Sequence, residues 1–183
     1  MDLNIKDDFL RLRDDRFSNI LHKLREQKYE PTFFQVIGKE HIEEIMVNTL
    51  AFFLDSKNPH GFGTRIFDTF CQAIENSSLI ENEEHKVLDY GEFKSLKKEI
   101  THKNDADETG RLDLIINCKN CIIGIEAKVR HIVNNPFLVY DDLMIREAKE
   151  SSQDNIKKVI LCKRGTKIDS AKAGGWIVVH WED

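Results

Sequence analysis

One stretch of the chain, residues 110–128, constrains the fold more than any other. Two runs rich in isoleucine and leucine flank Lys119-Asn120, and asparagine tolerates the positive φ that a two-residue hairpin turn requires. The pattern therefore predicts a strand, a tight turn and a second, antiparallel strand. If Cys118 and Cys121 close the turn, the register of the whole hairpin is fixed.

This register sorts the side chains onto two faces, because the side chains of a strand alternate. One face is apolar and is predicted to be core: Leu112, Leu114, Ile116, Ile123, Ile125 and Ala127. The other face gathers charged residues at one end of the hairpin. There Asp113 lies opposite Glu126, and Arg111 lies opposite Lys128.

Two carboxylates directly across a ladder are roughly 5 Å apart and repel each other. A divalent cation would offset the repulsion, and a hard ion such as Mg²⁺ binds carboxylate oxygens while it keeps waters for a phosphate or a nucleophile. On the same face, Lys128 would orient or activate the attacking water, or stabilise charge on the phosphate. The alternative is a salt-bridged surface patch in which the two basic residues only neutralise Asp113 and Glu126.

Length and composition favour one compact domain over residues 1–183, with N-terminal helices in 1–78 and a sheet core in 90–181. No apolar run approaches the roughly 20 residues that span a bilayer. The charged start of the chain also lacks the apolar stretch of a signal peptide. We therefore expect a cytoplasmic protein that makes no membrane contact.

The net charge of −5 argues against a protein that coats nucleic acid by bulk attraction. The acidic excess lies in residues 1–90. Contact with a polyanion should therefore be local and made by residues 91–183. Its candidate cationic residues are Lys94, Lys97, Lys98, Lys103, Arg111 and Arg130.

Apolar periodicity and turn residues predict the remaining elements. The expected helices cover 3–28, 39–54, 64–74 and 135–151, and the expected outer strands cover 92–102, 157–162 and 176–180. A strand, a helix and a strand in succession imply a right-handed crossover to a parallel neighbour. The sheet should therefore be mixed, with helices packed on it.

Two further residues are candidates for function. The helix over 39–54 has a predicted buried stripe of Ile42, Ile45, Met46, Thr49, Leu50 and Phe53. Glu44 is expected at the edge of this stripe, where a half-buried acid needs a partner; the alternative is an exposed helical glutamate. His60 lies in the following loop, either as a turn or capping residue or as a functional group.

The succession of these features resembles the PD-(D/E)XK nuclease superfamily over residues 33–181. Gly-Arg-Leu-Asp at 110–113 and Ile-Glu-Ala-Lys at 125–128 resemble its central motif. Upstream, residues 44–55 and 59–63 resemble the N-terminal signature of one restriction-endonuclease-like subgroup, in which an acidic helix leads into a Leu-Asp and His-Gly loop. The resemblance implies an α/β fold with a restriction-endonuclease-like mixed central sheet, an αβββαβ core and flanking helices.

Carried over by position, the resemblance makes Asp113 and Glu126 metal ligands and Lys128 the catalytic lysine. Glu44 becomes the helix acid that completes or supports the metal site. Candidates of lower rank are Glu99 and the Ala127 backbone carbonyl as metal ligands, and Arg111, Arg130 and His60 as substrate contacts.

The resemblance further implies phosphodiester hydrolysis with Mg²⁺ or Mn²⁺, on DNA more than on RNA, with bacterial defence against foreign DNA as the setting. A homodimer is also implied, because similar nucleases often pair to cut both strands.

The sequence departs from the pattern at Leu112, where proline is usual. It also has Asn134, Asn135 and Phe137 where a helical glutamine is often found. The alternatives are an idle nucleic-acid-binding or protein-interaction domain, and hydrolysis of another phosphoester such as a nucleotide.

Overall fold

The computed structural model describes residues 42–81, 88–129, 135–169, 171 and 174–182, together with positions 36 and 38. The chain divides into two units, Met1–Glu40 and His41–Asp183, and every element named below belongs to the second. The helix predicted over 3–28 lies outside the described residues. One domain over 1–183 therefore stays a prediction.

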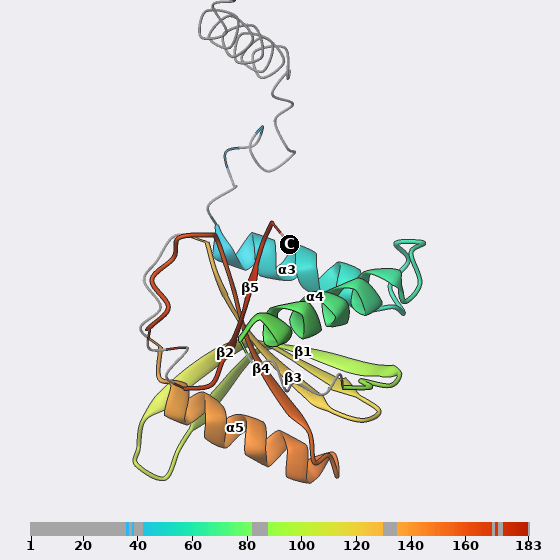
Figure 1. The fold of residues 1–183 in the computed structure, drawn as a ribbon. Coiled ribbons are helices and arrows are strands. Elements are labelled where there is room, and N and C mark those ends of the chain that lie inside the picture. Colours follow the sequence, from blue (N-terminus) through green and yellow to red (C-terminus); the bar gives the residue numbers. More distant parts are fainter. Residues whose placement is uncertain are drawn as a thin grey trace, which may run out of the picture. The chain divides into compact units, whose positions relative to one another are not determined.

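The second unit is built on a five-stranded sheet in the order β1-β2-β3-β4-β5 (Figure 1). The strands are β1 (Phe93–Lys103), β2 (Thr109–Cys118), β3 (Ile122–Lys128), β4 (Ile156–Cys162) and β5 (Ile177–His180). The first three pair antiparallel and the last three pair parallel. The predicted mixed sheet is confirmed.

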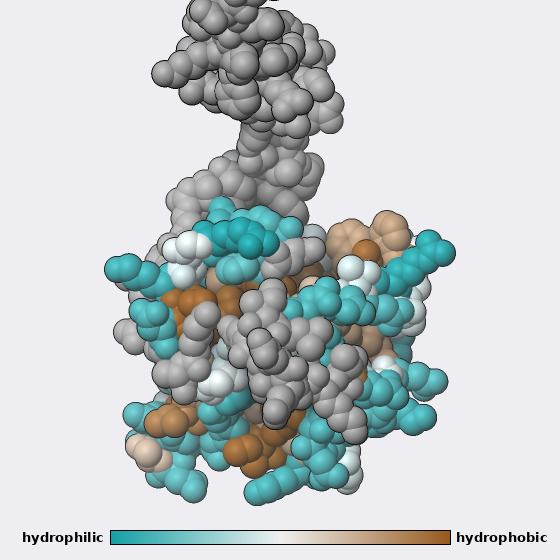
Figure 2. Space-filling view, viewed as in Figure 1, coloured by the Kyte–Doolittle hydropathy of each residue, from teal (hydrophilic) through white to brown (hydrophobic). Residues whose placement is uncertain are grey.

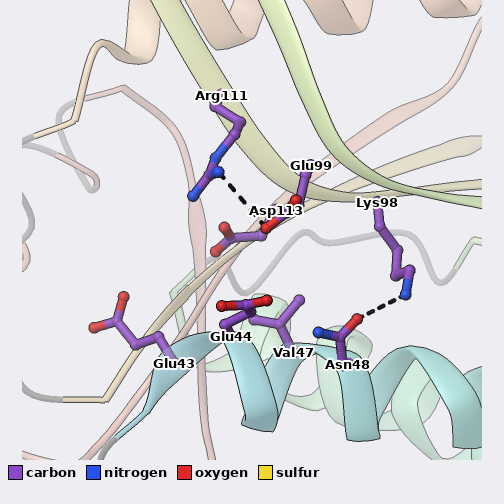
Figure 3. A pocket seen from close by; sticks show the side chains of 8 residues that line it. All are labelled: Glu43, Glu44, Val47, Asn48, Lys98, Glu99, Arg111 and Asp113. Atoms are coloured by element: carbon purple, nitrogen blue, oxygen red, sulfur yellow. Dashed lines mark hydrogen bonds and ion pairs between the residues drawn. The ribbon is translucent and has the colours of Figure 1, made fainter.

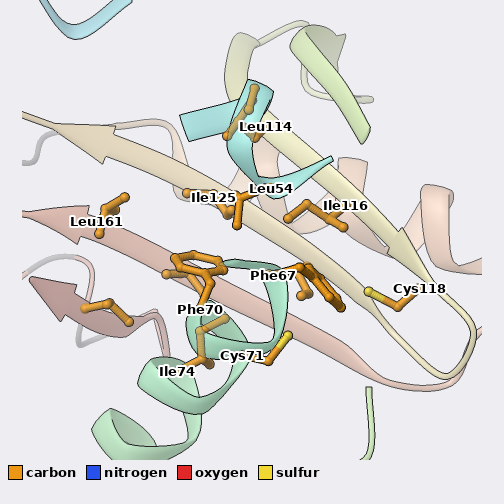
Figure 4. Packing of buried hydrophobic residues seen from close by; sticks show 14 of the residues in the cluster. Leu54, Phe67, Phe70, Cys71, Ile74, Leu114, Ile116, Cys118, Ile125 and Leu161 are labelled. Carbon is orange, nitrogen blue, oxygen red and sulfur yellow. The ribbon is translucent and has the colours of Figure 1, made fainter. Parts of the chain in front are cut away.

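Helices cover both faces of this sheet. Residues of α3 (Glu43–Leu54) and α4 (Arg65–Glu81) share a buried cluster with one side of β2 and β3, part of which Figure 4 shows. Residues of α5 (Phe137–Glu150) pack against the other side. Because it is covered on both sides, β3 is buried from Ile122 to Ala127, as expected of a central, largely apolar strand. This is the predicted restriction-endonuclease-like α/β architecture.

None of the described helices has the length and apolar character needed to cross a bilayer.

The register of the β2–β3 hairpin is the predicted one, because Leu114 pairs with Ile125 and Asn117 pairs with Ile122. The paired ladder ends at Leu114 and Ile125, however, one step before the two acids. Leu112 also departs from the prediction. It lies in the cluster on the α5 side, whereas Leu114 lies on the side of α3 and α4.

The break in alternation coincides with an irregularity between β1 and β2. Their pairing skips Glu99 and Asp113, and Glu99 has a positive φ of 51°, which is uncommon for a residue with a side chain. Leu112 then faces α5 near Gly124. An added Cβ at Gly124 would lie 2.5 Å from Met144 Sδ, so glycine allows α5 to approach β3 closely.

The buried side of α3 also differs from the predicted stripe. Its fully buried residues are Val47, Ala51 and Leu54, whereas Ile42 is 37% exposed. The helix is rotated relative to the prediction, because apolar residues on several of its sides make the buried side ambiguous. As a result Glu43, rather than Glu44, shares a line with Val47 and Ala51.

Candidate active site

The two acids of the hairpin meet just beyond the last ladder pair. Asp113 turns toward β3, where its Oδ2 accepts a hydrogen bond from the Ala127 amide at 2.8 Å. Burial raises the pKa of Asp113, while the Ala127 amide and the nearby Lys128 cation oppose the rise. The backbone of the neighbouring strand therefore fixes the direction of the Asp113 side chain. Its carboxylate is partly shielded from solvent.

Glu126 is the most enclosed acid of the site, with a side chain only 3% exposed. Its Oε1 accepts hydrogen bonds from Lys128 Nζ at 2.9 Å and from Asn135 Nδ2. Its Oε2 is buried and has no hydrogen-bond partner among the described residues. Burial and then the Asp113 charge raise the pKa of Glu126 to about 7. A buried oxygen without a partner is costly, so this atom is suited to a cation.

Lys128 lies between the strand acids and α3. Its Nζ is 2.9 Å from Glu126 Oε1 and 3.6 Å from Glu43 Oε2. Burial lowers the pKa of Lys128, but the surrounding acids outweigh burial and the net pKa is raised, so the amine is a cation at neutral pH. Its backbone carbonyl accepts a hydrogen bond from Trp181 Nε1 at 3.1 Å.

Glu43, in the first turn of α3, is a site residue that the sequence prediction missed. Its Oε1 accepts a hydrogen bond from the Val129 amide at 3.2 Å, and its other oxygen approaches Lys128. Its helical spacing could have identified it from the sequence, since Glu43 precedes the buried Val47 and Ala51 by four and eight residues. The predicted Glu44 is exposed, but it too lies beside Asp113.

A small cavity of about 70 Å³ lies between α3 and Asp113, and neither Glu126 nor Lys128 lines it. Its lining residues are Glu43, Glu44, Val47, Asn48, Lys98, Glu99, Arg111 and Asp113. Figure 3 shows Asp113 between Arg111 and Glu99 on one side and Glu44 on the other. Arg111 Nη1 is 3.6 Å from Glu99 Oε1, and both side chains are about half exposed or more. The structure thus places these sequence-predicted residues around one space.

Other polar groups hold the site from α5 and from the residues just before it. Asn135 Nδ2, besides binding Glu126, lies 3.2 Å from the Tyr140 hydroxyl, which donates to the Arg111 carbonyl at 3.0 Å. Burial and then the Glu126 charge raise the pKa of Tyr140 to about 12, so the phenol keeps its proton. Asn135 stands in the region where a glutamine was expected, and it reaches a site acid.

His60 and Arg130 are not placed at this site. The His60 ring is bound within its own loop, by the Asp55 carbonyl and the Phe62 amide, and His60 does not line the cavity. Arg130 lies outside the described residues. Ala127 is fully buried, and the role of its carbonyl as a metal ligand stays a prediction.

The donor set fits a hard divalent cation. Within the described parts of the chain, no three Asp, Glu, His or Cys side chains converge closely enough to hold a metal alone. Mg²⁺ does not require such a cage, since it is usually bound by one or two carboxylates and completes its shell with waters and substrate phosphate. Asp113 and the unpaired Oε2 of Glu126 supply such a pair.

The sequence was also compared with known protein families. The model of the PD-(D/E)XK nuclease superfamily matches residues 31–183. The chain therefore belongs to the PD-(D/E)XK nuclease superfamily, and nuclease-type hydrolysis is the activity that this membership supports. No curated protein and no solved structure matches the sequence.

Proposed function

We propose that the chain is an endonuclease that hydrolyses phosphodiester bonds with the help of Mg²⁺ or Mn²⁺. The observation that carries the proposal is the buried Oε2 of Glu126, which has no hydrogen-bond partner among the described residues. Asp113 is close enough to raise the Glu126 pKa, and Lys128 Nζ is 2.9 Å from the other Glu126 oxygen. Such an arrangement costs stability unless a cation joins it. The proposed use is the binding of a metal ion together with substrate.

In this proposal each residue has a separate task. Asp113 and Glu126 hold the cation, and Glu43 or Glu44 supports it from α3 directly or through water. When bound, the cation lowers the pKa of a coordinated water and offsets charge on the phosphate. Lys128, which is a cation held at 2.9 Å from Glu126, orients the attacking water or donates to the phosphate as negative charge develops.

The proposed substrate is DNA rather than RNA, because enzymes that this sequence resembles usually act on DNA. Defence of a bacterium against foreign DNA, within the cytoplasm, is the proposed setting. A homodimer would allow both strands of a duplex to be cut. These finer points rest on the resemblance, whereas the metal and lysine roles rest on contacts at the site.

The direct test is a digestion series on plasmid DNA, single-stranded DNA and RNA, with Mg²⁺, Mn²⁺ or EDTA. Lys128→Ala should lower cleavage at least a hundredfold, as loss of a proton-transfer or charge-stabilising group does, and should keep most metal affinity. A matched control is Lys149→Ala, because Lys149 is exposed in the last turn of α5 and does not line the site.

Calorimetric titration with Mn²⁺ separates this proposal from an idle domain. A nuclease should show one saturable site that Asp113→Asn removes and Asp107→Asn leaves intact, since Asp107 is 86% exposed. Equal cleavage by wild type, Lys128→Ala and Asp113→Asn would remove the proposal. Metal binding without cleavage of any nucleic acid would point instead to another phosphoester substrate.

A further inference from the structure

An aromatic cluster lies where α3 ends and the loop to α4 begins. We call this cluster, Phe52, Phe53, His60 and Phe62, the aromatic platform. The rings of Phe52 and Phe53 are 5.2 Å apart and edge-on, and those of His60 and Phe62 are 5.8 Å apart and stacked. Phe52 is 41% exposed and Phe62 is 48% exposed. Figure 2 shows an apolar patch over this end of the molecule.

The loop presents Phe62 in a fixed position. The Phe62 amide donates to His60 Nδ1 at 3.1 Å, which leaves the proton on Nε2 to be donated to the Asp55 carbonyl at 3.0 Å. Asn58 Nδ2 donates to the Phe52 carbonyl at 3.0 Å. These bonds hold the backbone at Phe62, and the Phe62 ring packs beside the rings of Phe53 and His60. A ring packed in this way loses less conformational freedom on binding, so it is prepared for a flat ligand. His60 acts here as a positioning residue for Phe62.

Two exposed cations lie on the segments that carry and follow the platform, although the chain as a whole carries a net charge of −5. Lys57 and Arg65 are exposed on the same loop and on the first residue of α4. Lys57 Nζ donates to the Lys94 carbonyl at 2.6 Å, which ties the loop to β1. The surface therefore combines flat apolar rings with local positive charge.

The platform begins one helical turn from the cavity beside Asp113. Asn48 lines that cavity and precedes Phe52 by one helical turn on α3. Lys98 lines it as well, and its Nζ donates to Asn48 Oδ1 at 2.6 Å (Figure 3). A track of Lys98, Asn48 and Phe52 thus leads from the acids to the platform.

We propose that the aromatic platform binds unpaired bases of the DNA strand whose phosphate occupies the acidic site, an inference that rests on the proposed function. Base faces stack on Phe52 and Phe62, and the backbone phosphates run past Lys98 and Lys57. Base-on-aromatic stacking with a cationic track is how proteins bind single strands with little sequence preference. A duplex hides its base faces, so the platform favours single-stranded or frayed DNA.

The test measures binding rather than cutting. Full-length protein carrying Asp113→Asn is titrated with a short fluorescein-labelled single strand and with the matching duplex, and anisotropy is recorded. Phe52→Leu and Phe62→Leu keep an apolar side chain but remove the ring. Each should weaken single-strand binding at least fivefold and change duplex binding less than twofold. The control is Leu138→Ala on α5, where Leu138 is 76% exposed, and it should change neither.

A second variant serves if the leucine variants fold poorly. Phe62→Trp places a third tryptophan, besides Trp176 and Trp181, on the platform. Single-stranded DNA should quench the added emission, measured as the difference from the protein without this substitution, while the duplex should not. Unchanged single-strand affinity in both leucine variants, equal losses for single strand and duplex, or an unquenched tryptophan would each overturn the proposal. Wild-type cleavage tests the proposed function separately, so the two can fail independently.

Discussion

Asp113 Oδ2 accepts the Ala127 amide hydrogen at 2.8 Å, so a side chain of β2 binds the backbone of β3 just where their paired ladder has ended. This one contact aims the Asp113 carboxylate toward Glu126. It leaves the other oxygen of Asp113 available for a ligand. Asp113 thus has a structural role, as the partner of the Ala127 amide, and a chemical role, as a candidate metal ligand. Substitutions at Asp113 separate these two roles.

Asp113→Asn and Asp113→Ala should differ in stability but agree in metal binding. Asparagine keeps an oxygen for the Ala127 amide, whereas alanine leaves that buried amide unpaired at a cost of about 1–3 kcal/mol. Both remove the carboxylate, so both should lose saturable Mn²⁺ binding. Urea unfolding without metal and a Mn²⁺ titration measure the two effects. Equal stability of the two variants would contradict the structural role of the hydrogen bond.

Metal affinity should rise with pH up to neutrality. The pKa of Glu126 is about 7, so below pH 7 a proton must leave before its carboxylate binds a cation. We expect the Mn²⁺ association constant to increase about tenfold per pH unit well below 7 and to level off above it. Electron paramagnetic resonance titrations at several pH values measure this slope. Glu44→Gln should keep the slope, and a flat profile in the wild type would count against the role of Glu126.

Glu126→Gln should stabilise the metal-free protein at high pH. Between the ordinary glutamate value of 4.5 and about 7, the folded state binds more protons than the unfolded state. The favourable contribution of Glu126 is therefore complete below pH 4.5 and is lost as the pH rises through 7. At pH 8 its charged form costs up to about 3 kcal/mol. The variant should exceed the wild type in unfolding free energy at pH 8 and lose that advantage at pH 5; a pH-independent difference would refute this.

Glu43 should matter more to cleavage than Glu44. Glu43 binds the Val129 amide and approaches Lys128, so it orients the end of β3, whereas Glu44 is exposed. Removal of an acid that positions a metal-site group lowers activity about 10–100-fold. We expect that loss for Glu43→Gln and less than a threefold change for Glu44→Gln. Initial cleavage rates under saturating Mn²⁺ compare the two variants. A larger loss for Glu44→Gln than for Glu43→Gln would make Glu44 the acid of α3 that supports the site.

The register of the hairpin could be predicted from local signals, although neither Lys119 nor Asn120 has the positive φ from which the turn was predicted. The register brings Asp113 and Glu126 to the same end of the ladder, and the Ala127 amide then aims the Asp113 carboxylate. The side of Leu112 could not be predicted, since it depends on the positive φ of Glu99 in a neighbouring strand. Tertiary irregularities of this kind leave no mark in the local pattern.

The helix acid was harder to identify than the strand acids. Apolar residues occupy several sides of α3, so its buried side depends on how Val47 and Ala51 pack against the sheet. Asn135 was noticed only as a departure from a family pattern. Its contact with Glu126 depends on the path of the chain between β3 and α5, which periodicity does not predict.

The hydrogen bond from Trp181 to the Lys128 carbonyl joins positions 53 residues apart. During synthesis the ribosome delivers the acids and the lysine well before this indole. A nascent chain therefore carries the reactive groups before the support that fixes them. Hydrolytic competence should therefore follow completion of the sheet, whose last strand ends at His180, and a chain truncated before Trp181 should bind metal weakly while retaining its hairpin.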